Sequence, residues 1–362
     1  MAYTTIDDPS AYFQVAVYTG NGNDDKSIPF SSPNFTNEYV GQEIQGDLFI
    51  VKRTDSGTDH WDITDTVRGV GKQLLFSTAV ESSESNCIKT VSSNGMTLGT
   101  NPQVNRADEP YICYIWKAGT TASASESGSN LAYSRSINTT SKFMISAYTG
   151  TGNSGDTLAH GLGSAPKWFM CKNRTANGWS WYVYHGANTS APETDNLYFN
   201  NDDGTLDAAD RWDDTAPSGT ELAFGDNGGI NADANSYMCY AWGEVQGYSK
   251  FGTYTGNNNT DGPFVYLGFK PAWIFLKKTS GTADWQIRSY VSDVYNEDSD
   301  EILMSSNNDG FTTSTNNIVD FLSNGFKLRG SGGDHNGNDT FVYGAFARHP
   351  FVTSKGIPVP AQ

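Results

Sequence analysis

A repeated arrangement of aromatic residues, glycines and a lysine is the feature that most constrains this chain. Two copies share the order Tyr-Thr-Gly, Pro-x-Trp and Lys, and they run from Tyr148 to Lys172 and from Tyr254 to Lys277. A third copy from Tyr18 to Lys52 is longer and lacks the Pro-x-Trp, which indicates an insertion. Because both the letters and the spacing recur, the sequence predicts three copies of one structural unit.

The residues around these copies favour strands. Aromatic and β-branched residues occur in short runs between clusters of Gly, Asn and Asp, a pattern typical of many short strands. The run from Phe13 to Tyr18 alternates with a period of two, and no window shows the sustained 3.6-residue period of a long helix. We therefore expect an all-β chain of three tandem β-sandwich, jelly-roll-like repeats of about 100 residues each.

The predicted division of the chain follows from the copies and from a change in composition. Residues 118–142 are rich in Ser, Thr and Gly and cannot bury enough apolar surface to fold alone, so they form a linker or a strap laid on neighbouring repeats. The expected parts are a leader (1–11), repeat 1 (12–117), the linker (118–142), repeat 2 (143–248), repeat 3 (249–351) and a tail (352–362).

Large aromatic residues recur at matching places in the copies, and we expect them to be core or inter-sheet residues. Burial of each would remove roughly 150–250 Å² from water, which makes them the main source of stability for so small a unit. The matched sets are Trp168 and Trp273; Trp61, Trp181 and Trp285; and Trp116, Trp242 and Phe346.

Charge and cysteine content exclude several classes of protein. The chain has 23 basic and 40 acidic residues, and no run of Lys and Arg is longer than two, so a groove for nucleic acid is not expected. No stretch approaches the roughly 20 apolar residues that cross a bilayer, and the first residues lack a secretory signal, so we expect synthesis in a cytoplasm without membrane insertion. The four cysteines lack metal or disulfide spacing and are predicted to be buried free thiols.

Several short motifs stand out along the chain, including Asp65-Thr-Val-Arg-Gly69, Asn94-Gly-Met-Thr-Leu-Gly99, Tyr148-Thr-Gly-Thr-Gly152, His160-Gly-Leu-Gly163, Gly247-Tyr-Ser-Lys-Phe251 and Asn324-Gly-Phe-Lys-Leu328. Together they resemble an uncharacterised family of repeats that is widespread in marine bacteriophages. The resemblance covers about residues 12 to 351 and implies a virion component of the tail-fibre or lectin-like kind, without naming a catalytic residue.

Signals of enzymatic chemistry are weak in this sequence. Gly150-Thr-Gly152-Asn-Ser-Gly155 matches a dinucleotide pattern, but strand and turn residues follow it where a helix N-terminus is needed. No Gly-x-Ser-x-Gly elbow occurs, and the five histidines have no metal-ligand spacing. We therefore predict that the protein is not an enzyme.

Two candidate binding features remain. Asp334, Asn336 and Asp339 place oxygen ligands on a short polar stretch that suits an irregular calcium-binding turn, the one metal we consider. Trp179 and Trp212 lie outside the matched aromatic positions, and an exposed indole beside acids and amides can stack on a pyranose ring. Burial under a loop is the alternative for both tryptophans.

These observations predict a structural bacteriophage protein displayed on the virion surface, as a head decoration or a tail-fibre component. Its expected partners are other virion proteins and copies of itself, with a trimer among the possible homo-oligomers. The unmatched segments 21–46, 118–142 and 353–362 are expected to carry most contacts between subunits. The alternative function is a carbohydrate-binding module that recognises host surface glycans without catalysis.

Overall fold

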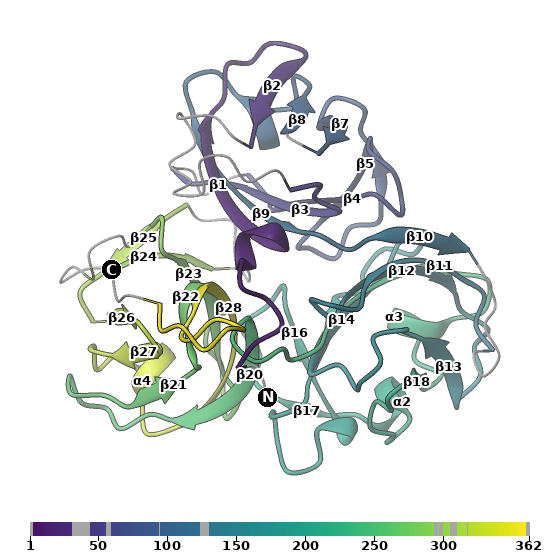
Figure 1. Cartoon of the computed structure of the whole chain (residues 1–362). Coiled ribbons are helices and arrows are strands. Elements are labelled where there is room, and N and C mark those ends of the chain that lie inside the picture. Colours follow the sequence, from purple (N-terminus) through teal and green to yellow (C-terminus); the bar gives the residue numbers. More distant parts are fainter. Residues whose placement is uncertain are drawn as a thin grey trace.

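Three β-rich lobes surround a common centre in the computed structural model of the chain (Figure 1). The structure describes residues 3–30, 44–55, 59–93, 95–123, 130–292, 296, 300–304, 310–316 and 318–359. Within these ranges most elements are antiparallel strands and every helix is short, which confirms the prediction of a mostly β chain without long helices. Asn94 and part of each of the three unmatched segments (31–43, 124–129 and 360–362) lie outside the described residues.

Lobe 1 contains a six-stranded sheet in the order β1-β9-β3-β4-β5-β6 and a three-stranded sheet in the order β2-β8-β7. Its elements are η1 (Pro9–Ala11), β1 (Phe13–Thr19), β2 (Lys26–Pro29), β3 (Leu48–Arg53), β4 (Asp62–Asp65), β5 (Lys72–Leu75), β6 (Ser82–Ser83), β7 (Ile88–Ser92), β8 (Gly95–Leu98), α1 (Pro102–Asn105) and β9 (Pro110–Trp116).

Lobe 2 contains an eight-stranded sheet in the order β10-β11-β12-β19-β14-β15-β16-β17 and a two-stranded sheet of β13 and β18. Its elements are β10 (Thr120–Ser123), β11 (Tyr133–Asn138), β12 (Phe143–Thr149), β13 (Asp156–Ala159), β14 (Trp168–Asn173), β15 (Trp181–His185), η2 (Pro192–Thr194), β16 (Asp195–Tyr198), β17 (Leu206–Asp207), α2 (Ala209–Trp212), β18 (Glu221–Phe224), α3 (Gly228–Asn231) and β19 (Ser236–Trp242).

Lobe 3 contains a six-stranded sheet in the order β20-β28-β22-β23-β24-β25 and a three-stranded sheet in the order β21-β27-β26. Its elements are β20 (Ser249–Thr255), β21 (Phe264–Tyr266), β22 (Phe269–Lys278), β23 (Gln286–Ser289), β24 (Asp300–Met304), β25 (Thr312–Ser314), β26 (Val319–Leu322), β27 (Gly325–Leu328), α4 (Gly333–Asn336) and β28 (Thr340–Pro350).

The three large sheets share one pairing order along the chain. In each of them the first long strand pairs with the last, the last pairs with the strand that carries the buried lysine, and that strand pairs with the next. The registers also correspond, because Leu48 lies opposite Trp116, Trp168 opposite Trp242, and Trp273 opposite Phe346. The aromatic residues that match in the sequence therefore occupy matching places on the strands.

The segment expected to link repeats 1 and 2 is partly strand. β11 pairs with β12, and β10 pairs with β11, so the segment extends the large sheet of lobe 2. Its described part is therefore two further strands of that sheet, because the backbone groups of Tyr133–Asn138 are paired with those of Phe143–Tyr148.

Apolar residues form two local cores and one shared core. One local core lies between the two sheets of lobe 1, and another lies between the two sheets of lobe 2. The third cluster contains buried residues from all three large sheets, together with the interior of lobe 3. The matched tryptophans are buried as predicted, but they join the shared cluster instead of serving a separate core in each repeat.

The Tyr-Thr-Gly copies have a common local role. In each copy the tyrosine hydroxyl donates a hydrogen bond of 2.6–2.8 Å to a backbone carbonyl of the short helix before the last strand. The glycine two residues later allows the chain to approach that region, because an added Cβ would lie 2.0–2.5 Å from a carbonyl oxygen. The tyrosines are Tyr18, Tyr148 and Tyr254, and the glycines are Gly20, Gly150 and Gly256.

Candidate functional site: lobe joints and a surface cleft

Aromatic rings from all three lobes meet at the centre of the molecule. Trp168 stacks on Trp242 with ring centroids 4.1 Å apart, and Trp116 makes edge contacts with Trp242 and Trp273 at 5.8 and 5.6 Å. None of these four side chains is more than 2% exposed. Separation of the lobes would expose this cluster to water, so the lobes form one body.

Hydrogen bonds join each lobe to the next, and two of them come from indole N–H groups. Trp181 in lobe 2 donates from Nε1 to the carbonyl of Leu75 in lobe 1 at 2.7 Å, and Trp285 in lobe 3 donates to the carbonyl of Tyr198 in lobe 2 at 2.8 Å. Lobe 3 contacts lobe 1 through a hydrogen bond that the Phe311 amide donates to the Thr54 carbonyl at 2.6 Å. The joints therefore close a ring of three lobes.

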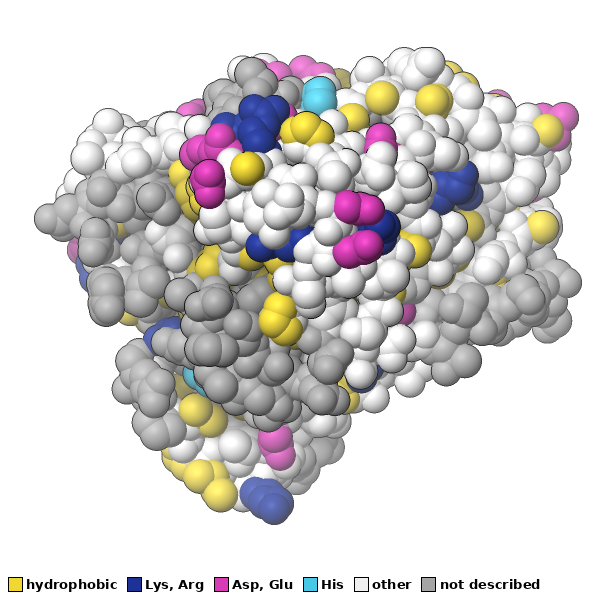
Figure 2. Space-filling view, turned by 90° about the horizontal axis from the view of Figure 1, so that it is seen from above, with side chains coloured by type: hydrophobic (Ala, Val, Ile, Leu, Met, Phe, Trp, Pro, Cys, Tyr) yellow, Lys and Arg dark blue, Asp and Glu magenta, His cyan; other side chains and the backbone are white. Residues whose placement is uncertain are grey.

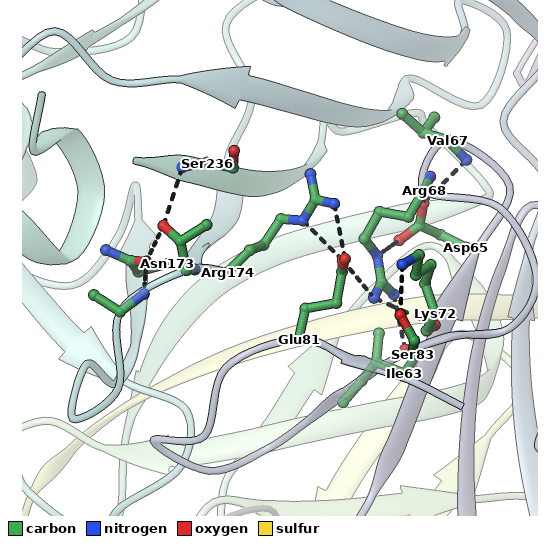
Figure 3. Close-up of polar contacts among 12 residues, drawn as sticks. Ile63, Asp65, Val67, Arg68, Lys72, Glu81, Ser83, Asn173, Arg174 and Ser236 are labelled. Atoms are coloured by element: carbon green, nitrogen blue, oxygen red, sulfur yellow. Dashed lines mark hydrogen bonds and ion pairs between the residues drawn. The ribbon is translucent and has the colours of Figure 1, made fainter. Parts of the chain in front are cut away.

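An ion-pair network strengthens the joint between lobes 1 and 2 (Figure 3). Arg68 is fully buried and paired with Asp65, which also accepts a hydrogen bond from the Tyr240 hydroxyl of lobe 2 at 2.7 Å. Glu81 accepts from two guanidinium nitrogens of Arg174 at 2.8 and 3.0 Å and lies 3.5 Å from Arg68. Burial alone would lower the pKa of Arg68, but the nearby carboxylates raise it above its ordinary value. The charges alternate in sign, and the network fixes the segment of lobe 1 that carries Glu81 on lobe 2.

Each of the repeated lysines is fully buried at the end of a central strand. Their ammonium groups donate to backbone carbonyls, namely from Lys52 to Asp59 at 2.7 Å, from Lys172 to Trp179 at 2.6 Å and from Lys277 to Asp202 at 2.9 Å. Burial lowers the pKa of Lys172 and of Lys277 to about 8. Lys52 and Lys172 thereby hold the loops that follow them, and Lys277 holds both Asp202 of lobe 2 and, through the Ala283 carbonyl, its own following loop. Their burial keeps solutes away from the amines.

A cleft lies where the N-terminal leader meets lobes 2 and 3. Its volume is about 500 Å³ and its walls present hydroxyl, amide, carboxylate and ammonium groups. The Tyr3 hydroxyl donates to the Gly268 carbonyl at 2.7 Å and lies 3.5 Å from the hydroxyl of Tyr266, a residue that is 49% exposed. The lining residues are Tyr3, Thr4, Thr5, Thr139, Thr140, Lys142, Glu244, Val245 and Gln246.

The sequence did not reveal this cleft as a site. Three segments that lie far apart in the chain form it, and its residue types are common in surface loops. The sequence predicted the leader only as a polar stretch. The one available signal was a tyrosine in that stretch, which is too weak to identify a site.

The two candidate sugar-stacking tryptophans differ in exposure. Trp212 is 1% exposed, its Nε1 donates to the Asp195 carbonyl at 2.9 Å, and its ring packs on Phe169, so the alternative of burial holds at this position. The single turn of α2 points the indole inward, although charged residues flank it in the sequence. Trp179 is half-buried and lies beside Gly228. Stacking by Trp179 stays a prediction.

Two residues of the candidate calcium turn, Asn336 and Asp339, have other partners, and the third, Asp334, is exposed. The Asn336 side chain is fully buried, and it accepts from the Asn257 amide and donates to the carbonyls of Asn259 and Gly330. Asp339 is paired with Lys278 at 2.8 Å, and Asp334 is exposed. Among the described residues, no three His, Cys, Asp or Glu side chains gather as a metal site requires. The geometry does not support a calcium site built from this set.

All four cysteines are buried, as predicted. Cys113 and Cys239 occupy matching places on the last strands of lobes 1 and 2. Cys239 also lies directly opposite Cys171 on the neighbouring strand, a pairing that the sequence spacing did not suggest.

The surface seen in Figure 2 is polar, and basic and acidic side chains lie close together on it. Lys89, for example, forms ion pairs with Asp24 and Asp25 at 2.9 and 2.7 Å. In the part of the chain that the structure describes, no helix has the length and apolar character needed to span a membrane.

Comparisons with known proteins identify a family. Neither the curated proteins nor the solved structures gave a match. A family model described as Domain of unknown function (DUF7483) matches residues 8–350, which include all three lobes. The chain therefore belongs to the DUF7483 family.

Proposed function

We propose that this protein is a structural component displayed on the surface of a bacteriophage particle, as a head decoration or part of a tail fibre. The observation that carries the proposal is the closed ring of three lobes around a shared aromatic core. In the described residues, the buried charged and polar groups of the joints serve to hold lobes together. Such a molecule is suited to a rigid structural role rather than to catalysis.

The proposal includes the internal architecture of the chain, three copies of one β-sandwich repeat. Support comes from the common pairing order of the large sheets and from the local bonds that recur with it. The last turn before the closing strand carries a buried asparagine in each lobe, and its side-chain amide donates to backbone carbonyls of the preceding loops. These residues are Asn105, Asn231 and Asn336.

A ring of three similar lobes also suggests how the protein meets its neighbours. One chain presents three related surfaces around a centre, which approximates the threefold symmetry of many assembly sites without needing three chains. Contacts with other virion proteins and with copies of the same chain would then use the segments in which the lobes differ. The tail is one such segment, since Ile357 is 60% exposed and Ser354 is bound to Asp7.

Electron microscopy of purified phage particles with gold-labelled antibody against this chain tests the proposal. Label at regular positions on heads or on tail fibres is the expected result. Particles that lack both the label and peptides of this chain by mass spectrometry would refute it.

The cleft favours a second function, recognition of host surface glycans. Its hydroxyl, amide and charged groups suit a polyhydroxylated ligand, and the exposed rings of Tyr266 and Phe264 lie on the adjacent strand β21. A glycan array probed with the full chain would show binding that Tyr266→Ala and Glu244→Gln weaken. Trp179→Ala serves as the matched comparison, because it would weaken binding only if that tryptophan is the stacking residue. Absence of sugar release in a reducing-sugar assay would separate a binding module from a hydrolase.

A further inference from the structure

Two cysteines face each other at the centre of lobe 2. Cys171 on β14 and Cys239 on β19 are direct partners in an antiparallel register without a bulge. The same register places Arg174 opposite Ser236, and the Arg174 amide donates to the Ser236 carbonyl, so Arg174 and Ser236 are a hydrogen-bonded pair of the ladder. Because such pairs alternate along the ladder, Cys171 and Cys239 form a non-hydrogen-bonded pair, the kind in which Cα atoms lie about 4.5 Å apart.

This placement suits a disulfide bond. Directly opposed residues of an antiparallel pair point to the same face of the sheet, and a spacing of about 4.5 Å falls within the range of Cα separations that disulfides span. Both side chains belong to the apolar cluster between the two sheets, and both are fully buried. Little backbone movement would be needed to join them.

We infer that Cys171 and Cys239 are the site of an intramolecular disulfide that forms when the chain folds in contact with a low-molecular-weight disulfide such as oxidised glutathione. The thiolate of one cysteine attacks the glutathione disulfide, forms a mixed disulfide and releases one glutathione thiolate. The second cysteine loses its proton, attacks the cysteine sulfur of the mixed disulfide and releases the second glutathione. The two cysteine protons end on the two glutathione thiols, so the cysteines are oxidised and glutathione is reduced.

Burial determines when the reaction can occur. In the folded protein both sulfurs are shielded, and burial raises the pKa of the Cys239 thiol, so the reactive thiolate is scarce. The bond forms before β14 closes on β19 or during a local opening of the pair. The loop it closes contains β15 to β18, so it would hold the centre of lobe 2 together.

The other lobes provide internal comparisons. The corresponding pairs are Val51 with Cys113 in lobe 1 and Leu276 with Tyr343 in lobe 3. Cys113 therefore occupies the matching strand position without a thiol opposite it. Cys87 accepts a hydrogen bond from Gln73 in the small-sheet region of lobe 1. The inference does not depend on the proposed virion role, although a protein displayed outside a cell would meet oxidising conditions.

The test is oxidative refolding of the full chain from urea in a glutathione buffer, followed by alkylation and peptide mapping by mass spectrometry. We expect one bond between Cys171 and Cys239, two alkylated thiols at Cys87 and Cys113, and a Tm higher by about 5 °C or more that a reductant reverses. Cys113→Ser should keep the bond and the Tm rise, whereas Cys171→Ala should abolish both.

Alkylation of all four thiols after oxidative refolding would overturn the inference, and so would a bond that maps to Cys113. If the chain does not refold from urea, the same map is made on chain produced in an oxidising bacterial periplasm. There too, four free thiols would refute the proposed pair.

Discussion

Removal of the Trp273 side chain is the sharpest test of the central aromatic cluster. Trp273 is 2% exposed, and its ring contacts rings from all three lobes, including Trp116 at 5.6 Å, Trp168 at 6.5 Å and Phe346 at 5.8 Å. Truncation of a buried tryptophan to alanine typically costs about 3–5 kcal/mol, and each lost aromatic pair adds about 0.5–1.5 kcal/mol beyond area burial. Because rigid strands of three sheets surround the site, collapse of the cavity is limited. We expect Trp273→Ala to lower the free energy of unfolding by about 4–5 kcal/mol.

Urea denaturation followed by far-ultraviolet circular dichroism measures this loss without relying on tryptophan fluorescence. Trp179→Ala is the matched control, because that indole is half-buried at the edge of lobe 2, and we expect it to cost less than about 1.5 kcal/mol. A loss for Trp273→Ala no larger than that of the control would show that the central cluster does not stabilise the ring. An unfolding curve that splits into separate transitions in the variant would instead support the role of Trp273 in coupling the lobes.

Three further predictions follow from the buried polar groups and the tail. Burial lowers the pKa of Lys172 to about 8, whereas the unfolded lysine titrates near 10.4, so the unfolded state binds more protons than the folded state above pH 8. The free energy of unfolding should therefore rise from pH 8 to 9.5 relative to that of Lys172→Met. A difference between the two proteins that does not change with pH would contradict this. Asn231→Ala should lower the free energy of unfolding by about 2–4 kcal/mol in the same urea assay, because it leaves the Thr151 amide and the carbonyls of Asn153 and Gly225 without this partner. Asn153 is exposed, so Asn153→Ala should lower it only slightly. Deletion of residues 356–362 should reduce the amount of this chain bound to phage particles in a sedimentation assay, while the circular dichroism of the monomer stays unchanged. Binding at the level of the full chain would exclude the tail as a contact segment.

Much of the local structure was accessible from the sequence because its causes are local. Short β-branched and aromatic runs between turn residues predict strands, and most strands lie where such runs occur. The copies beginning at Tyr148 and Tyr254 occupy matching strands because equal spacing places equal residues on equal faces. Burial of the cysteines and matched tryptophans also follows from the cost of exposing such side chains.

The candidate sites were less accessible because exposure and proximity depend on the whole fold. Trp212 stands among charged residues in the sequence, yet one turn of helix buries its ring, and the buried Asn336 side chain bonds to backbone groups of neighbouring loops. The cleft at Tyr3 joins three segments that no local pattern connects.

The sequence by itself determined the strands, the positions of the recurring motifs and the apolar faces, because side-chain chemistry and chain spacing act over a few residues. Tertiary structure alone decided that the matched tryptophans meet across lobes and that Cys171 lies opposite Cys239. The physical reason is that pairing between distant strands and packing between sheets are set by the joint burial of many surfaces. The residues next to a tryptophan in the sequence can predict that it is buried. The residues that pack on it lie elsewhere in the chain, so only the tertiary structure identifies them.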